Sequence, residues 1–315
     1  MSFVGPADDP HGRAEDGRRA HDGTMTGARA AGPAAPVPWT RYLALGDSFT
    51  EGLWDLPADS GGSGGRTAGP GPGDEGRRLR GWADRLAETL SARRVAAGDA
   101  PLEYANLAVR GRLVRPIVRE QLPLALSFEP DLVSLVAGGN DILRPTVDVD
   151  AVSAVIDEAV GRLRAGGADV LLATGFDAAG SPVIELTRGR VGRFNANLWS
   201  IARAHDAFVL DLWGMRSLRD RRVWSEDRIH LRPEGHRRVA QGALVALGLV
   251  PDDGLWDVPL SGAEPLPWRR RASEDARWAR EHLLPWATRR LRARSSGDDR
   301  APKDDRPRPV PPSAP

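Results

Sequence analysis

The chain has 315 residues and a formal net charge of +1, because 44 Lys and Arg residues stand against 43 Asp and Glu residues. This balance argues against nucleic acid as the main partner. The sequence contains no Cys, which excludes disulfides, thiolate metal ligands and Cys nucleophiles and fits a cytoplasmic protein.

The composition divides the chain into four parts. Residues 39–250 carry the apolar patterning of one α/β domain, and residues 251–293 form a Trp- and Arg-rich appendage with a helix expected over about 272–293. The flanking residues 1–38 and 294–315 are rich in Gly, Pro and charged residues, so we expect two disordered tails. We find no signal peptide and no transmembrane segment of about 18 apolar residues, and Met25 is a candidate alternative start.

The N-terminal half of the domain alternates between strand and helix patterns. An unbroken apolar run at 42–46 predicts a buried strand, and the segment 55–80 reads as a Gly- and Pro-rich loop. A helix is expected over 82–95 and a second strand over 104–108. The next helix, over 113–126, should bend or end at Pro123.

The same alternation continues through the C-terminal half of the domain. It predicts strands at 131–136, 170–174 and 208–212 and helices at 149–163, 191–204 and 233–247. Five strands with intervening helices indicate a parallel sheet covered by helices on both faces. Binding sites in such sheets form at the carboxyl ends of the strands.

Three polar motifs fall at those carboxyl ends. Gly-Asp-Ser at 46–48 follows the first strand, Asn-Leu-Ala-Val-Arg-Gly at 106–111 covers the end of the second, and Gly-Gly-Asn-Asp at 138–141 follows the third. A lone Ser after a Gly usually makes a turn or caps a helix. Motifs that converge on one sheet edge instead favour an acyl-transfer site with Ser48 as the nucleophile.

The candidate base is His230, which follows Asp227 by three residues just before a helix that begins at Pro233. One loop can then hold the carboxylate against one ring nitrogen while the other nitrogen faces Ser48. The alternatives are a helix cap or half of a metal site, but a metal needs further grouped ligands, which we do not find. We therefore expect no metal and no cofactor. We expect His236, on the last helix, to lie at the surface.

Two further donors join the backbone N–H of Ser48 in the expected oxyanion hole. Gly111 has no Cβ, so its N–H can approach an oxyanion, and Asn140 offers its side-chain amide. Taken singly, Gly111 and the glycines at 138–139 more often make tight turns. Asp47 and Asp141 are expected to brace the loops in supporting roles.

Taken in order, the four blocks resemble the SGNH hydrolases, also called the GDSL esterase/lipase family, over about 41–250. The resemblance implies a flavodoxin-like three-layer α/β/α sandwich with a five-stranded parallel sheet. It also implies ester hydrolysis through an acyl-enzyme. By that likeness Ser48 is the nucleophile, His230 the base and Asp227 its orienting acid, and the oxyanion hole consists of Ser48, Gly111 and Asn140.

Two positions depart from the usual pattern of that family. Phe49 follows the nucleophile where the family name has Leu, an apolar exchange of little chemical consequence. Arg110 precedes Gly111 where a small residue is common, and Arg112 follows it. Either arginine can reach the pocket rim and favour an acidic substrate, but a solvent-exposed role is more frequent for arginine.

The expected function is hydrolysis of a small-molecule carboxylic ester. Acyl transfer to another alcohol and deacetylation of a carbohydrate use the same site and stay open. A third reading is a non-catalytic scaffold whose segment 251–293 binds a partner or makes peripheral contact with a membrane, although we expect this segment to pack as a strap on the core. Trp54, Trp224 and the loop 55–80 are candidate walls of the acyl pocket.

Overall fold

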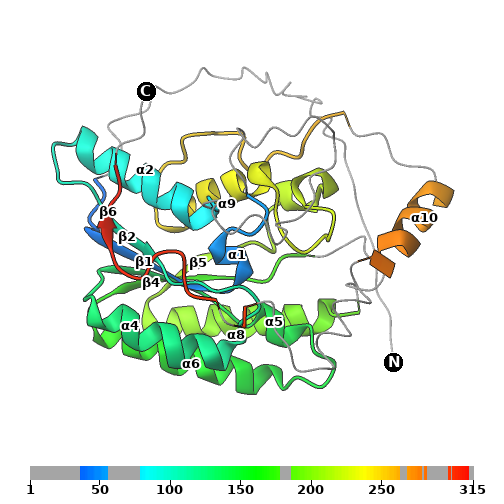
Figure 1. Ribbon diagram of the computed structural model, residues 1–315, viewed down its shortest axis with the longest axis horizontal. Coiled ribbons are helices and arrows are strands. Elements are labelled where there is room, and N and C mark those ends of the chain that lie inside the picture. The colour runs from blue at the N-terminus through cyan, green and yellow to red at the C-terminus, as the bar shows by residue number, and fades with distance from the viewer. Residues whose placement is uncertain are drawn as a thin grey trace, which may run out of the picture. The chain divides into compact units, whose positions relative to one another are not determined.

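The computed structural model describes residues 36–55, 79–177, 186–262, 268–278, 280–281, 297–298 and 300–311. The expected tail at 1–38, apart from its last three residues, and most of the loop 55–80 lie outside these ranges. The described core is built on a six-stranded sheet with the order β5-β4-β3-β1-β2-β6 (Figure 1). Within the same ranges, no helix is long and apolar enough to cross a bilayer.

Five of the strands run parallel, which confirms the expected sheet. They are β1 (Arg41–Gly46), β2 (Glu103–Asn106), β3 (Leu132–Val136), β4 (Asp169–Ala173) and β5 (Phe208–Leu210). Their apolar runs are buried because helices cover both faces of the sheet. Gly46 pairs with Val136, so the ends of β1 and β3 are level and the motifs that follow them begin at the same sheet edge.

The sixth strand corrects the expectation of a disordered tail over 294–315. β6 (Arg308–Pro309) pairs antiparallel with β2, and the Val310 N–H donates to the Leu102 carbonyl at 2.8 Å. The Ser91 hydroxyl donates to the Val310 carbonyl at 2.9 Å. The open edge of β2 and the nearby Ser91 side chain supply these partners, and a proline is tolerated in such an edge strand.

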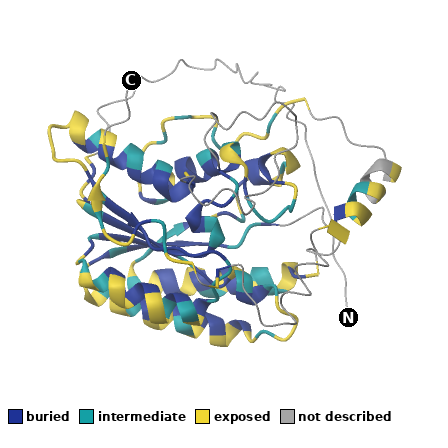
Figure 2. Ribbon diagram, viewed as in Figure 1, coloured by how far each residue is buried: buried dark blue, intermediate teal, exposed yellow. Residues whose placement is uncertain are grey.

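Helices form one layer on each side of the sheet. α2 (Trp82–Ala96) and α9 (Pro233–Ala246) cover one face, and α4 (Leu122–Ser127), α6 (Val149–Ala165) and α8 (Arg188–His205) cover the other (Figure 1). Figure 2 shows buried residues along the strands and exposed residues on the outer sides of these helices. The apolar side chains fall into two clusters, one for each face of the sheet. The expected three-layer α/β/α arrangement is therefore confirmed.

The helical segment before β3 bends through a π-helical turn. α3 (Val114–Pro116) leads into η1 (Ile117–Gln121) and then into α4, and the Leu122 N–H bonds the Ile117 carbonyl five residues back. Pro123 lies in the first turn of α4, where its missing N–H removes no required bond. The bend expected at Pro123 is thus taken up by the turn that precedes it.

The remaining elements are short or lie after the core. α1 (Ser48–Glu51) and α5 (Gly139–Ile142) follow β1 and β3, and two single 3₁₀ turns, η2 (Ser217–Arg219) and η3 (Arg221–Val223), precede the loop of Asp227. The Arg238 guanidinium of α9 donates to the carbonyls of Trp256 at 3.0 Å and Val258 at 2.5 Å, which ties the chain after Pro251 to the core. α10 (Trp268–Trp278) begins earlier than the helix expected over about 272–293, and most of the rest of that expected helix lies outside the described residues.

Candidate active site

The turn after β1 is held by a side chain that no sequence motif identifies. The Gly46 N–H donates to Gln121 Oε1 at 2.8 Å, and Gln121 Nε2 donates to the Gly46 carbonyl at 2.9 Å. Asp47 caps α1, because its carboxylate accepts from the Phe49 N–H at 3.0 Å. The buried Gln121 amide therefore fixes the backbone directly before Ser48, and the π-helical turn that carries it is part of the site's support.

Ser48, His230 and Asp227 form a continuous hydrogen-bonded chain. The Ser48 hydroxyl lies 2.8 Å from His230 Nε2, and His230 Nδ1 lies 2.6 Å from Asp227 Oδ2. A carboxylate only accepts hydrogen bonds, so it fixes the tautomer with the proton on Nδ1 and leaves Nε2 to accept from the Ser48 hydroxyl. The structure thus brings together three side chains that the sequence places up to 182 residues apart.

The environment of Asp227 keeps its carboxylate charged. Its Oδ1 accepts from the Ser225 hydroxyl at 2.5 Å and from the N–H groups of Ile229 and His230 at 3.0 Å each. Burial acts to raise the pKa of Asp227, but the facing charge of His230 and these hydrogen bonds outweigh burial and hold the pKa well below its usual range. Ser225 is a contributor that the sequence analysis missed.

The loop that carries Asp227 and His230 is closed by its own backbone. Trp224 and Leu231 form an antiparallel bridge, and the Ser225 N–H donates to the His230 carbonyl at 2.8 Å. Arg228 turns the chain with a φ of 60°, in the left-handed region that non-glycine residues rarely adopt. The expectation that one loop presents both the acid and the base agrees with this geometry.

Asn140 and the two supporting carboxylates link the motifs to one another. Asn140 Nδ2 donates to Asp47 Oδ2 at 2.8 Å and to the Arg112 carbonyl at 3.2 Å. Asp141 accepts from the Val114 N–H at 2.9 Å, at the start of α3. Burial raises the pKa of Asp47 to about 6, although the hydrogen bond from Phe49 and the nearby His230 act to lower it.

Gly111 lies in the loop after β2 with a φ of 72°, a conformation that glycine adopts without strain. Among the described residues, the cavity beside Ser48 is lined by Asp47, Asn140 and His230 but not by Gly111. The neighbouring Arg110 is buried rather than solvent-exposed, which corrects the sequence expectation. Its guanidinium pairs with the buried Glu51 carboxylate of α1 at 2.5 Å, and its N–H donates to the same carboxylate at 2.8 Å.

His236 is also buried, contrary to the expectation of a surface position. Its Nδ1 accepts from the Trp82 N–H at 3.2 Å, because this face of α9 packs against α2. Its Nε2 lies 3.4 Å from the Leu53 carbonyl. Burial lowers the pKa of His236 to about 3, so the imidazole stays neutral near neutral pH and holds the start of α2.

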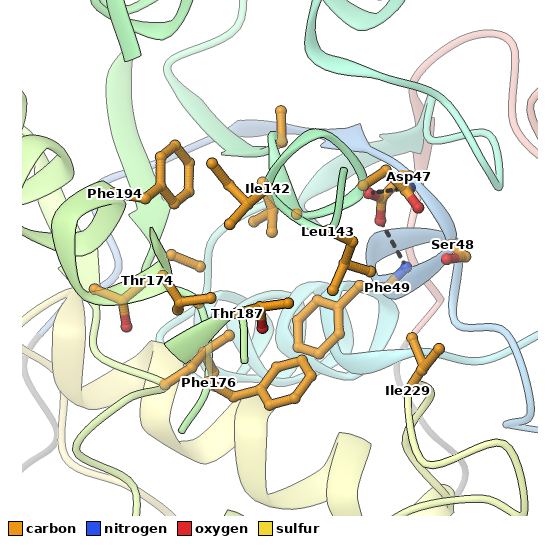
Figure 3. Close-up of a pocket in the computed structure, with 18 of the residues that line it drawn as sticks. Asp47, Ser48, Phe49, Ile142, Leu143, Thr174, Phe176, Thr187, Phe194 and Ile229 are labelled. Carbon is orange, nitrogen blue, oxygen red and sulfur yellow. Dashed lines mark hydrogen bonds between the residues drawn. The ribbon is translucent and has the colours of Figure 1, made fainter. Parts of the chain in front are cut away.

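Two of the expected walls of the cavity beside Ser48, Trp54 and Trp224, lie elsewhere, and most of the third, the loop 55–80, lies outside the described residues. Trp224 is buried, donates through Nε1 to the Leu218 carbonyl at 2.7 Å, and packs on Phe176 with ring centroids 4.4 Å apart. Neither Trp224 nor Trp54 lines the cavity. The walls are instead side chains of α1, α5, α8 and the chain after β4, as Figure 3 shows, among them Phe49, Leu143, Phe194 and Phe176.

Helix α10 contacts the loop that carries Asp227. The Trp278 indole N–H donates to the Asp227 carbonyl at 2.9 Å, and the Arg228 guanidinium lies 5.0 Å from the centroid of the Trp278 ring. Arg228 also pairs with Asp275 at 2.6 Å. This part of the appendage therefore packs on the core, as expected for a segment that forms a strap. Within the described ranges, no group of three or more His, Cys, Asp or Glu side chains is arranged to hold a metal ion.

Comparisons with known proteins bear on the family and the fold of the chain. The model of the GDSL-like Lipase/Acylhydrolase family matches residues 44–238, and no curated protein matches the chain. LAE5, an alpha/beta hydrolase enzyme from the metagenome of Lake Arreo, Spain, is 22% identical, with 66% of this chain and 95% of that chain covered at a TM-score of 0.53. Axe2, an acetylxylan esterase from Geobacillus stearothermophilus, is 20% identical, with 68% of this chain and 97% of that chain covered at a TM-score of 0.53. At these identities the two structures establish the shared fold, while the family match spans more than half of the chain. The chain therefore belongs to the GDSL-like lipase/acylhydrolase family of ester hydrolases.

Proposed function

We propose that this protein hydrolyses carboxylic esters through a covalent acyl-enzyme formed on Ser48. The observation that carries the proposal is the hydrogen-bonded chain from the Ser48 hydroxyl to His230 at 2.8 Å and from His230 to Asp227 at 2.6 Å. A serine hydroxyl is a weak nucleophile near neutral pH, and a hydrogen-bonded imidazole activates it by accepting its proton.

The reaction proceeds in two steps. Ser48 Oγ attacks the ester carbonyl carbon while His230 Nε2 takes the hydroxyl proton, and the leaving alcohol then receives that proton. In the second step a water molecule gives a proton to His230 and attacks the acyl carbonyl, which releases the carboxylic acid and returns the proton to Ser48. Asp227 remains ionised and stabilises the imidazolium, in keeping with the low pKa of its carboxyl group.

The negative charge on the carbonyl oxygen is assigned to three N–H donors: the backbone of Ser48 and Gly111 and the side-chain amide of Asn140. The position of Asn140 supports this assignment, because it lines the same cavity as Ser48 and His230. The Asp47 carboxylate accepts from Asn140 Nδ2, so the amide nitrogen faces the turn that carries Ser48. Both N–H groups of the Asn140 amide bond to the protein, one to Asp47 and one to the Arg112 carbonyl, so one of these bonds must be exchanged for the developing oxyanion.

Transfer of the acyl group to a second alcohol uses the same acyl-enzyme. Hydrolysis and transfer differ only in the nucleophile of the second step, so product analysis separates them. With a p-nitrophenyl ester and added methanol or glycerol, we expect free carboxylic acid as the main product. A new ester as the main product would assign the protein as an acyltransferase.

The proposal is tested by intact mass spectrometry after treatment with a fluorophosphonate, together with hydrolysis of p-nitrophenyl esters. We expect one adduct, mapped to Ser48 and absent from Ser48→Ala, with kcat reduced about 10⁶-fold in that variant. Asp227→Asn should retain more activity than His230→Ala, because the acid acts through the base and takes no proton itself. The matched control is Ser200→Ala, an exposed serine of α8 that should keep both the adduct and the activity. Wild-type activity in Ser48→Ala would overturn the assignment.

A further inference from the structure

The cavity that begins at Ser48 and His230 extends well beyond the reacting groups. Its volume is about 130 Å³. In Figure 3 the labelled Phe194 and Thr174 lie at the opposite end of the cavity from Ser48, and Leu143 and Phe49 lie between the two ends. In a reacting complex, the part of the substrate that occupies this space is therefore attached to the carbonyl carbon that Ser48 attacks, or lies directly beside that carbon.

The described wall of this cavity is mostly apolar away from the triad, and its hydroxyl-bearing side chains there are Thr174 and Thr187. Its side chains there come from four different segments: Phe49 from α1, Ile142 and Leu143 around α5, Phe176 after β4, and Val191 and Phe194 from α8. The charged or ionisable lining groups in the described part are Asp47, which precedes Ser48, and His230, which is hydrogen-bonded to Ser48, so both belong to the Ser48 end. Binding of an alkyl chain against aliphatic and aromatic side chains removes apolar surface from water on both sides, which is favourable.

The hydroxyl of Thr174 does not turn the far end into a polar subsite. Its Oγ1 donates to Asp211 Oδ1 at 3.1 Å and accepts from the Trp213 N–H at 3.0 Å. The Thr174 hydroxyl thus already donates one hydrogen bond to the protein and accepts another, so it adds little to the recognition of a ligand hydroxyl. Sugar binding needs several convergent donors and acceptors, and a hydroxyl-bearing ring placed here would lose hydrogen bonds to water without replacement.

We infer that this cavity binds the aliphatic acyl chain of the substrate and that the protein prefers esters of medium-chain fatty acids, of about six carbons, over acetyl esters of carbohydrates. The inference rests on the proposed function, because the acyl group must be carried by Ser48. A cavity of about 150 Å³ lined by apolar side chains accommodates benzene, a six-carbon molecule. The space of about 130 Å³ beside Ser48 is of the same order.

Two side chains of α8 set the length of chain that fits. Phe194 is buried and its ring lies against Gly138, where an added Cβ would come within 2.7 Å of the ring. Val191 is half-buried and lies against Gly175, where an added Cβ would come within 2.7 Å of its Cγ1. Neither glycine leaves space on its own side of these two side chains. A larger or smaller side chain at 191 or 194 therefore changes the volume of the cavity. A larger residue at 191 shortens the space for the chain, and a smaller one at 194 lengthens it.

The test is the chain-length profile of kcat/KM for p-nitrophenyl acetate, butyrate, hexanoate, octanoate and laurate. Each methylene moved from water into the cavity contributes about fourfold. Hexanoate has four more methylenes than acetate, so full burial would favour it by about 250-fold and burial of only two of them by about 16-fold. Val191→Trp should bring the hexanoate-to-acetate ratio to about one, and Phe194→Leu should move the optimum toward octanoate and laurate. Val245→Trp, the same exchange on the exposed side of α9, is the matched control and should keep the wild-type profile.

Fluorophosphonate labelling of Ser48 is measured on every variant, which separates the two proposals. Without an adduct and without turnover of any ester, the proposed function itself fails. With the adduct and turnover present, the acyl-chain assignment fails if acetate is the best substrate or if acetylated xylo-oligosaccharides surpass hexanoate. The acyl-chain assignment also fails if Val191→Trp, like the control Val245→Trp, keeps the wild-type chain-length profile. A shift in opposite directions for Val191→Trp and Phe194→Leu is the result that supports it.

Discussion

Lys303 lies in the C-terminal segment and is enclosed by the core. Its ammonium donates to the carbonyls of Glu51 at 2.8 Å and Leu79 at 3.1 Å and pairs with the Asp84 carboxylate at 2.6 Å. Only 14% of the Lys303 side chain and 9% of the Asp84 side chain are exposed. One side chain therefore ties the end of α1, the segment before α2 and α2 itself to the chain that continues into β6.

Lys303→Met keeps the aliphatic stem but leaves Asp84 buried without its cation. Removal of one partner of a buried ion pair costs about 3–5 kcal/mol of unfolding free energy. For a domain of about 150–250 residues, each kcal/mol corresponds to about 2–4 °C, so the melting temperature should fall by about 6–20 °C. Calorimetry and urea unfolding of the full-length chain measure the change.

The loss should also depend on pH. Burial already raises the pKa of Asp84, and Lys303 opposes this rise. Without Lys303 the folded protein favours the protonated carboxyl more strongly, so the stability deficit is small at about pH 4 and grows as pH rises through the folded pKa. The control is Arg306→Met. The ion pair of Arg306 with Asp305 is largely exposed, so its loss should change the unfolding free energy by less than about 0.5 kcal/mol. If Lys303→Met unfolds like Arg306→Met at pH 7, the reasoning about the segment 300–311 is refuted.

Two further predictions concern the residues around the triad. The pKa of Asp47 rises from 3.8 to about 6 on folding. This shift corresponds to about 3 kcal/mol of unfolding free energy. The contribution is fully present below about pH 4 and is lost as the pH rises through about 6. The unfolding free energy of wild type relative to Asp47→Asn should fall by that amount between pH 4 and 7 in urea titrations, and a constant difference would contradict the assignment. Trp278→Phe keeps the ring against Arg228 but removes the hydrogen bond to the Asp227 carbonyl, so kcat should fall about two- to tenfold with KM unchanged. Steady-state kinetics beside Trp199→Phe, an exposed tryptophan of α8, checks this, and equal kinetics would show that α10 does not position the loop.

The elements of the core were predictable because their signals are local. The apolar run at 42–46 needs burial on both faces wherever it lies, and the 3.6-residue spacing of Val152, Ile156 and Val160 specifies a helix face without reference to the rest of the chain. The loop of Asp227 and His230 is local too, since the carboxylate bonds the N–H groups two and three residues later. For the same reason, the motifs at 46–48, 106–111, 138–141 and 227–230 carried the family resemblance.

Tertiary structure alone decided the roles of residues whose partners are distant in the chain. Arg110 is buried because Glu51, 59 residues away, lies beside it, and Gln121 reaches Gly46 across 75 residues. The segment of β6 has no periodic apolar pattern, so contacts with distant parts of the chain order it: the open edge of β2, the Ser91 hydroxyl and the acceptors around Lys303. The apolar part of the acyl cavity likewise belongs to no single motif, because its walls come from α1, α5, the chain after β4 and α8. Sequence alone thus determined which chemistry the chain carries, whereas packing between distant segments determined the space in which that chemistry acts.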